Sequence, residues 1–322
     1  MIPIRDTVPS RHYPVANVIF IAVNILVFLM EMSEGEALNR FMYIYGLVPA
    51  RYSVSQIASH FTMFQQTFAF FSFMFLHGSF WHLAGNMWFL YIFGDAVEDR
   101  LGHLRYVIFY LLCGLASGFA HVFFNLESTM PTIGASGAIA GVMGAYFILY
   151  PKAKIVTLIP IIFIPYFVEL PAAIFLGIWF FIQFISATVT GIDASGIAWW
   201  AHIGGFIFGA VFLKIFLLIP GEGAPRTLSE ATVRRSTPRL HLARPVPHRE
   251  EAYLFDVINI TPEEAERGVR KMISVPFGYQ RKHLVVRIPP GIRDGTKLRL
   301  EGVGMKKDGG ERGDLYLQVS VR

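Results

Sequence analysis

The sequence predicts an all-α polytopic membrane domain of six transmembrane helices, followed by a small, mainly β domain. Of the 322 residues, 54% are hydrophobic and only 16% are charged, whereas soluble domains carry about 25% charged residues. The apolar residues gather in long runs that end near residue 220, and the sequence beyond residue 250 alternates as strands do. We therefore predict a membrane domain at 1–219, a basic Pro/Arg-rich linker at 220–250 and a β-domain at 251–322.

Six apolar runs have the length and composition of membrane-spanning helices, which need about 20 mostly apolar residues. We predict spans near residues 14–32, 80–98, 104–124, 136–150, 170–188 and 198–219. Two further stretches are also apolar, 62–75 in a long first loop and 155–167 before the fifth span. Pro160 and Pro165 interrupt the second of these, and proline removes a backbone donor. We expect this stretch to be an interfacial connection.

The basic residues in the loops predict the orientation, because cytoplasmic loops carry an excess of Lys and Arg. Twelve basic residues fall in the segments that six spans place on one side of the membrane, against Arg40 and Arg51 on the other. The twelve are Arg5, Arg11, Arg100, Arg105, Lys152, Lys154, Arg226, Arg234, Arg235, Arg239, Arg244 and Arg249. Both termini are therefore expected in the cytoplasm, and we expect a prokaryotic plasma (inner) membrane. The net charge of +5 is then explained without a nucleic-acid partner.

Four polar side chains stand out among those inside the predicted spans, where polar groups are costly and mark functional sites. His82 and Asn86 lie four residues apart on one face of the second span. Ser136 begins the fourth span, and His202 lies near the start of the sixth. These three spans run in the same direction, so all four residues are expected toward the external leaflet at similar depth.

Stripes of small residues in the fourth and sixth spans would let their backbones approach closely. The stripes are Gly137, Gly141 and Ala145 in the fourth span and Ala201, Gly205 and Gly209 in the sixth. Ser136 and His202 each lie beside the first member of a stripe. Packing one stripe on the other is expected to bring these two side chains within hydrogen-bond reach.

This set of residues has the chemistry of a serine hydrolase. A serine hydroxyl is a weak nucleophile until a base takes its proton, and an imidazole, with an unperturbed pKa of about 6.5, is a suitable base. Asn86, His82 and the backbone N–H groups at a helix start are donors for an oxyanion. Asp193, in the loop before the sixth span, lies on the same side of the membrane as the expected site. No carboxylate is well placed as a third member, so we predict a Ser136–His202 dyad rather than a triad.

Other interpretations use the same histidines. His82 and His202 could bind a metal, but no carboxylate or thiol completes a ligand set, and the single cysteine, Cys113, is expected in the core. They could instead relay protons in a transporter, but the fourth and sixth spans show no polar route to the cytoplasmic leaflet. We predict neither a metal nor a cofactor, and only the joint occurrence of the four residues favours hydrolysis.

Three motifs, in order and each on its own span, resemble those of the rhomboid family of intramembrane serine proteases. They are His77–Asn86 (HGSFWHLAGN), Gly134–Gly137 (GASG) and Ala201–Gly205 (AHIGG), and the resemblance covers residues 14–219. A first-loop segment, Pro49–Tyr52, also resembles the family, and its Arg51 is expected to be structural.

The resemblance implies that Ser136 is the nucleophile and His202 the general base and acid. It also implies an oxyanion hole of His82, Asn86 and the Ser136 N–H, with His77 and Gly134 in support. The implied substrates are transmembrane proteins, cut near the outer ends of their helices. Ala140 departs from members that stack an aromatic on the histidine at this position, so His202 must be supported from elsewhere. The alternative is a rhomboid-like protein that binds or remodels membrane proteins without cutting them, against which the intact Ser136, His202 and Asn86 argue.

The segment 251–322 is predicted to contain five strands and one short helix. The strands are expected at 256–260, 271–275, 284–288, 297–300 and 314–321, with a helix capped by Thr261 and turns at 289–291 and 308–310. Residues 260–269, 288–296 and 313–317 resemble the client-binding β-domain of Hsp40 (DnaJ-type) co-chaperones. Neither a zinc-binding Cys repeat nor a J-domain His-Pro-Asp motif occurs, so Hsp70 activation is not expected. The resemblance implies a cytoplasmic peptide or protein client bound at a sheet edge or groove, or else a purely structural role.

Overall fold

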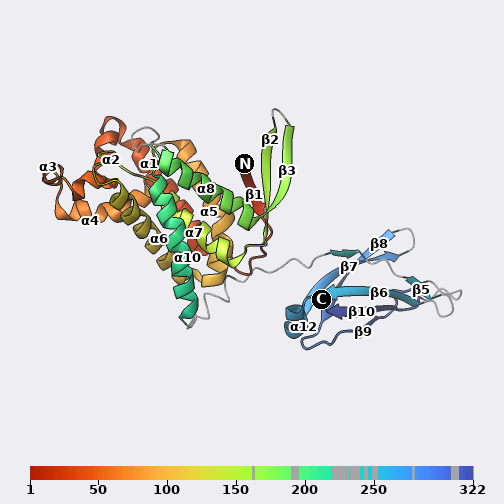
Figure 1. Cartoon of the computed structure of the whole chain (residues 1–322). Coiled ribbons are helices and arrows are strands. Elements are labelled where there is room, and N and C mark those ends of the chain that lie inside the picture. The colour runs from red at the N-terminus through yellow and green to blue at the C-terminus, as the bar shows by residue number, and fades with distance from the viewer. Residues whose placement is uncertain are drawn as a thin grey trace. The chain divides into compact units, whose positions relative to one another are not determined.

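The computed structural model of the chain divides into two compact units, Met1–Arg234 and Arg235–Arg322, of which the first is mainly helical and the second mainly β (Figure 1). The structure describes residues 1–161, 164–189, 196–219, 232, 240–242, 246–248, 253–277, 280–305 and 312–321.

Six long helices of the first unit fall on the six predicted spans. They are α1 (Val15–Ser33), α5 (Phe80–Leu101), α6 (His103–Phe124), α7 (Ser136–Leu149), α8 (Ala172–Val189) and α10 (Trp199–Leu218). Among the described residues, four of them, α1, α6, α8 and α10, are long and apolar enough to cross a membrane. The helical membrane fold is therefore confirmed, whereas six crossings remain a prediction, because α7 has 14 residues and α5 carries acidic side chains near its end.

Short helices make up the predicted first loop between α1 and α5. They are η1 (Gly35–Ala37), α2 (Leu38–Tyr45), η2 (Pro49–Tyr52), α3 (Ser55–Ala58), α4 (Met63–Ser72) and η3 (Phe73–Phe75). The apolar stretch predicted at 62–75 is thus helical, and Thr62 and Gln65 form a capping box at its start.

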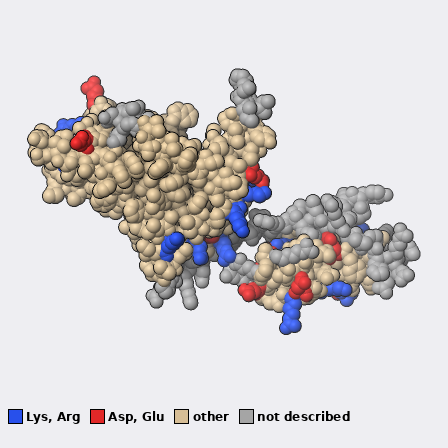
Figure 2. Space-filling view, in the orientation of Figure 1, with Lys and Arg blue, Asp and Glu red and all other residues tan. Residues whose placement is uncertain are grey.

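The outward faces of the long helices carry large apolar side chains. Leu26 of α1, Phe119 of α6 and Phe181 of α8 are 60%, 59% and 62% exposed. Exposed apolar surface of this extent indicates contact with lipid. On the face of the helical unit drawn in Figure 2, most Lys and Arg side chains gather toward one end of the helices.

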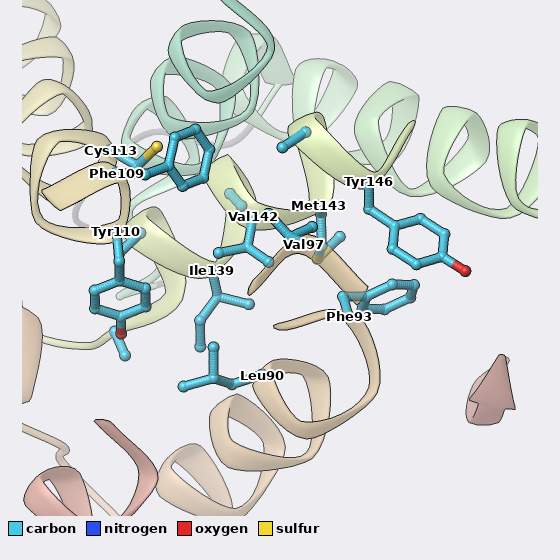
Figure 3. Close-up of a cluster of buried hydrophobic side chains, with 14 of the residues drawn as sticks. Leu90, Phe93, Val97, Phe109, Tyr110, Cys113, Ile139, Val142, Met143 and Tyr146 are labelled. Atoms are coloured by element: carbon cyan, nitrogen blue, oxygen red, sulfur yellow. The ribbon is translucent and has the colours of Figure 1, made fainter. Parts of the chain in front are cut away.

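Helix α7 lies at the centre of the bundle, and every residue from Gly137 to Tyr146 is buried. Its side chains interlock with those of α5 and α6 (Figure 3). The labelled members of this core are Leu90, Phe93 and Val97 of α5, Phe109, Tyr110 and Cys113 of α6, and Ile139, Val142, Met143 and Tyr146 of α7. Cys113 is fully buried, as expected of a core residue.

Helices α7 and α10 pack with their backbones in contact. A Cβ added at Gly205 would lie 2.0 Å from the carbonyl oxygen of Gly137, and one added at Gly209 would lie 2.1 Å from that of Gly141. No other residue type allows this approach. The predicted packing of one small-residue stripe on the other is confirmed, and it sets the distance between the first turns of the two helices.

Glu98 connects the predicted cytoplasmic ends of three helices. Its carboxylate accepts hydrogen bonds from the backbone N–H groups of Ala16 (2.9 Å) and Asn17 (2.7 Å), which begin α1 and have no partner in their own helix. His103, at the start of α6, contacts the same carboxylate at 2.5 Å. Between α5 and α6 the chain turns at Gly102 with φ of 83°, a conformation that favours glycine.

The stretch 155–167, expected as an interfacial connection, is part of a β-sheet. Strands β2 (Lys154–Ile161) and β3 (Ile164–Pro171) form an antiparallel hairpin, and β1 (Ile2–Asp6) pairs with β2. Two prolines in this stretch argue against a transmembrane span. In the hairpin they lie opposite each other, Pro160 across from Pro165, next to the turn. The β-branched run from Ile155 to Thr157 favours this extended structure.

The described residues of the second unit form two sheets and one short helix. Strands β5 (Val246–His248), β6 (Tyr253–Ile260), β10 (Leu315–Val321) and β9 (Lys297–Leu300) form one sheet in that order, with β6 and β10 parallel. Strands β4 (Leu240–Leu242), β7 (Val269–Phe277) and β8 (Gln280–Ile288) form the other. Apolar side chains from both sheets, among them Ile258, Ile273 and Leu317, make one core.

All five predicted strands of this unit are present, as β6, β7, β8, β9 and β10. Thr261 caps α12 (Pro262–Arg267) and forms a capping box with Glu264, as the Thr-Pro-Glu-Glu sequence predicts. The predicted turn at 308–310 lies outside the described residues. The two short strands β4 and β5 lie within the segment expected as a linker, so that expectation was wrong for these six residues.

Candidate active site

Ser136 is the first residue of α7, and the loop before it is fixed at three points. Leu47 and Thr132 exchange backbone hydrogen bonds of 2.9 and 2.8 Å. The Gly134 N–H donates to the Phe73 carbonyl at 2.8 Å. The Thr132 hydroxyl contacts His121 Nε2 of α6 at 2.7 Å. The position of the serine is therefore set by the first loop and by α6 as well as by its own helix.

His202, in the first turn of α10, lies opposite Ser136. Its Nε2 is 2.8 Å from Ser136 Oγ, which is hydrogen-bond distance for a base and a nucleophile. The close α7–α10 packing brings the first turns of the two helices together. The two residues that the sequence singles out on separate spans thus share one contact.

His202 has a second partner that the sequence analysis did not predict. Its Nδ1 lies 2.7 Å from Oε1 of Gln183 in α8, and the Gln183 side chain is buried. The ring centroids of Trp179 and Trp199 lie 6.0 and 6.2 Å from that of the imidazole. They take the place of an aromatic side chain at position 140, where this chain has alanine. The sequence signal was the four-residue spacing of Trp179 and Gln183, which puts both on one helical face. Asp193, the carboxylate considered earlier, lies outside the described residues.

Asn86 and His82 face the same cavity as the serine. The cavity has a volume of about 560 Å³ and is lined by these two residues together with Ser136, His202 and Gly134. Within the part of the chain that the structure describes, the buried Asn86 Nδ2 has no hydrogen-bond partner. Because an orphaned buried donor is costly, this amide is available for an acceptor that enters the cavity.

Gly134 brings the loop against His82. Its φ is +126°, and a Cβ at this position would lie 2.8 Å from His82 Nε2 and 3.6 Å from Ser136 Oγ. Any side chain here would fill the space between the serine and the histidine of α5. Gly134 therefore supports the site by keeping that space open.

His77 lies before α5 rather than on it, so it does not share the His82/Asn86 face. Its ring meets that of His82 edge-on, with centroids 5.1 Å apart, and its N–H donates to the Glu31 carboxylate at 3.1 Å. Burial, with a smaller effect of neighbouring His82, lowers the pKa of His77 to about 4. A neutral ring behind His82 fits a supporting position.

Arg51 is buried in the first loop and does not line the cavity. Its Nη1 donates to the Ile44 carbonyl at 3.2 Å, and its guanidinium lies 3.6 Å from the ring centroid of Phe61. Burial lowers the pKa of Arg51 to about 10. These contacts place it in the internal packing of the loop. The described residues contain no cluster of three or more His, Cys, Asp or Glu side chains that could hold a metal.

Comparison with known proteins identifies two domains. Residues 65–219 match the family model of the Rhomboid domain, and residues 256–322 match that of the DnaJ C terminal domain. The first region contains Ser136, His202, His82, Asn86 and Gln183.

Curated relatives match this chain through DnaJ-type sequence. A DnaJ-like protein of Synechocystis sp. is 38% identical over 64 residues, which are 20% of this chain and 18% of that protein. Chaperone protein DnaJ 2 of Aquifex aeolicus is 47% identical over 47 residues, 14% of this chain and 12% of that protein. A curved DNA-binding protein of Pseudomonas syringae pv. tomato is 35% identical over 68 residues, 21% and 20%. The chain thus spans at most about a fifth of the length of these relatives.

Proposed function

We propose that this chain, which joins a rhomboid domain to a DnaJ C terminal domain, is a serine endopeptidase that hydrolyses peptide bonds in or near transmembrane helices. The observation that carries the proposal is the 2.8 Å contact between Ser136 Oγ and His202 Nε2. It lies beside a cavity into which the unpartnered Asn86 amide is also placed. A protein that only binds membrane helices has no use for this combination.

The reaction follows from the positions of these groups. His202 Nε2 takes the Ser136 proton as Oγ attacks the scissile carbonyl carbon, and the carbonyl oxygen becomes an oxyanion. Asn86, His82 and the Ser136 N–H donate to this oxyanion. The imidazolium then gives its proton to the amine nitrogen as the C–N bond breaks. The amine departs, and the acyl group stays on Ser136 Oγ as an acyl-enzyme. A water molecule, deprotonated by His202, releases the acid and regenerates Ser136.

The substrates follow from the position of the site. Ser136 is the first residue of α7 and His202 lies in the first turn of α10. With both termini in the cytoplasm, both helices start at the outer side of the membrane. The cut is then expected near the outer end of a substrate helix, where small residues and helix-breakers expose the backbone. The site as proposed uses only side-chain and backbone groups, without a cofactor or metal.

The test of this function is cleavage of a single-span model substrate by the purified full chain in liposomes. We expect one main cut near the outer end of the substrate helix. A soluble protein without an apolar segment serves as the control and should stay intact. An intact single-span substrate, for several unrelated helices, would contradict the proposal.

Replacing Asn86 with alanine should lower kcat by about 10- to 1,000-fold, because one oxyanion donor is lost. KM should change little, since the donor acts in the transition state. Asn24→Ala is the matched control, because Asn24 is a buried amide of α1 outside the cavity. If kcat were unchanged in both His82→Ala and Asn86→Ala, α5 would not contribute donors to the oxyanion hole.

The DnaJ-type unit is proposed to bind cytoplasmic segments of substrates or partner proteins. With six crossings it follows the last span into the cytoplasm, whereas the dyad lies toward the external leaflet. A tethered binding module raises the local concentration of its ligand, and here the tether is the segment 219–239, which connects α10 to β4.

Deleting the second unit, residues 235–322, should therefore leave cleavage of a minimal single-span substrate nearly unchanged. It should lower kcat/KM by about 10-fold or more for substrates with long cytoplasmic segments. The measurement compares the two substrate types with the full and shortened chains at equal amounts of folded protein. An equal loss of kcat/KM toward both substrate types would assign the unit a role in folding or assembly. Cleavage of the unit by a protease added outside intact cells would overturn the orientation.

A further inference from the structure

We infer that Gln183 is a positioning residue that holds His202 in the orientation and protonation form needed to activate Ser136. The inference rests on the proposed function, and it adds to the predicted Ser136–His202 dyad a third residue, Gln183, that orients the imidazole without taking up its proton. The supporting contact is the 2.7 Å distance between Gln183 Oε1 and His202 Nδ1.

The place of Gln183 separates it from the substrate. Its side chain is 6% exposed and is absent from the residues that line the cavity, whereas Ser136, His202 and Trp179 all line it. Gln183 therefore lies behind the imidazole as seen from the cavity. Its effect on the reaction must pass through His202.

The protonation form of His202 depends on what its Nδ1 meets. A neutral imidazole carries one proton, so Nε2 can accept the serine proton only when Nδ1 carries the hydrogen. A buried Nδ1–H needs an acceptor, and Gln183 Oε1 is at the right distance. If the amide nitrogen faced Nδ1 instead, the hydrogen would move to Nε2 and the base would be lost.

A glutamine suits this position better than the carboxylate found in many serine proteases. An ionised side chain inside a membrane domain is costly, and no compensating cation is found among the cavity-lining residues. The amide oxygen provides the acceptor without a charge. Trp179, one turn earlier on α8, packs against the same imidazole at an interplanar angle of 37°, so a single face of α8 supplies both the polar and the apolar support.

The test compares two nearly isosteric variants. Gln183→Met keeps the volume and removes the acceptor, and it should lower kcat by about 10- to 100-fold, within the range of general acid–base effects, with KM unchanged. Gln183→Glu keeps an acceptor and should retain most of the limiting kcat that is reached at high pH. Thr188→Val, a loss of a polar group on the same helix away from His202, is the control and should match the wild type.

The pH profile distinguishes positioning from simple packing. A glutamate at 183 would stabilise the imidazolium when ionised, so His202 would stay protonated to higher pH. The acidic limb of kcat should therefore move to higher pH in Gln183→Glu. The other titratable groups at this cavity are His82 of α5 and His121 of α6, and they are unchanged in both variants.

The outcomes separate this inference from the proposed function. An active wild type whose Gln183→Met variant keeps its kcat would overturn the role of Gln183 while leaving the protease intact. A fall in kcat with no recovery in Gln183→Glu, and no shift of the acidic limb, would also overturn it. Thermal unfolding in detergent shows whether each variant is folded, and the rate of Ser136 phosphonylation gives a second readout that needs no substrate.

Discussion

Replacing His202 with alanine should lower kcat for a transmembrane substrate by roughly 10⁴-fold or more, the range found when a serine hydrolase loses its base. Without the imidazole, the Ser136 hydroxyl has no acceptor for its proton and stays a weak nucleophile. The measurement is single-turnover cleavage in liposomes. His60→Ala, an exposed histidine of the first loop outside the cavity, is the control. A variant without His202 that keeps more than a tenth of the wild-type rate would rule out this base.

Replacing Ser136 with alanine should have an equal or larger effect, roughly 10⁴- to 10⁶-fold. It removes the one oxygen that forms the acyl-enzyme, and the fold should be unaffected because a single atom is lost at the cavity wall. Ser117→Ala is the matched control. Ser117 is a buried serine of α6 whose hydroxyl donates to the Gly114 carbonyl of its own helix, next to Gly137. Cleavage by both variants at similar rates would mean that the serine of α7 is not the nucleophile.

Much of the membrane unit could be predicted because its signals are local. A long apolar run indicates a span by itself, and the positions of α6 and α10 follow from length and hydropathy alone. The approach of Ser136 to His202 could also be predicted, because glycines at four-residue spacing on two helices favour close packing of their backbones. The β-domain shows the same principle, since Thr261 and Glu264 form their capping box within a single turn.

Contacts between distant segments could not be predicted in this way. Strand β1 pairs with β2 across about 150 residues of sequence. The five residues of β1 contain no signal that predicts which strand they pair with. Glu98 lies at the end of α5 that the loop charges predict to be cytoplasmic, but its contacts with the start of α1 depend on how two helices pack. A carboxylate is the usual third residue beside such a histidine, so the sequence does not single out Gln183, although a membrane interior favours an uncharged acceptor.

The most direct measurement for the central claim is labelling of the folded protein with a fluorophosphonate, which reacts with serines that a neighbouring base activates. We expect mass spectrometry to find the phosphonyl group on Ser136 of the wild type. Labelling should be at least about 100-fold slower in His202→Ala, from the loss of general-base catalysis, and absent at this position in Ser136→Ala. Equal labelling of the wild type and the Ser136→Ala variant, or of Ser136 with and without His202, would contradict it.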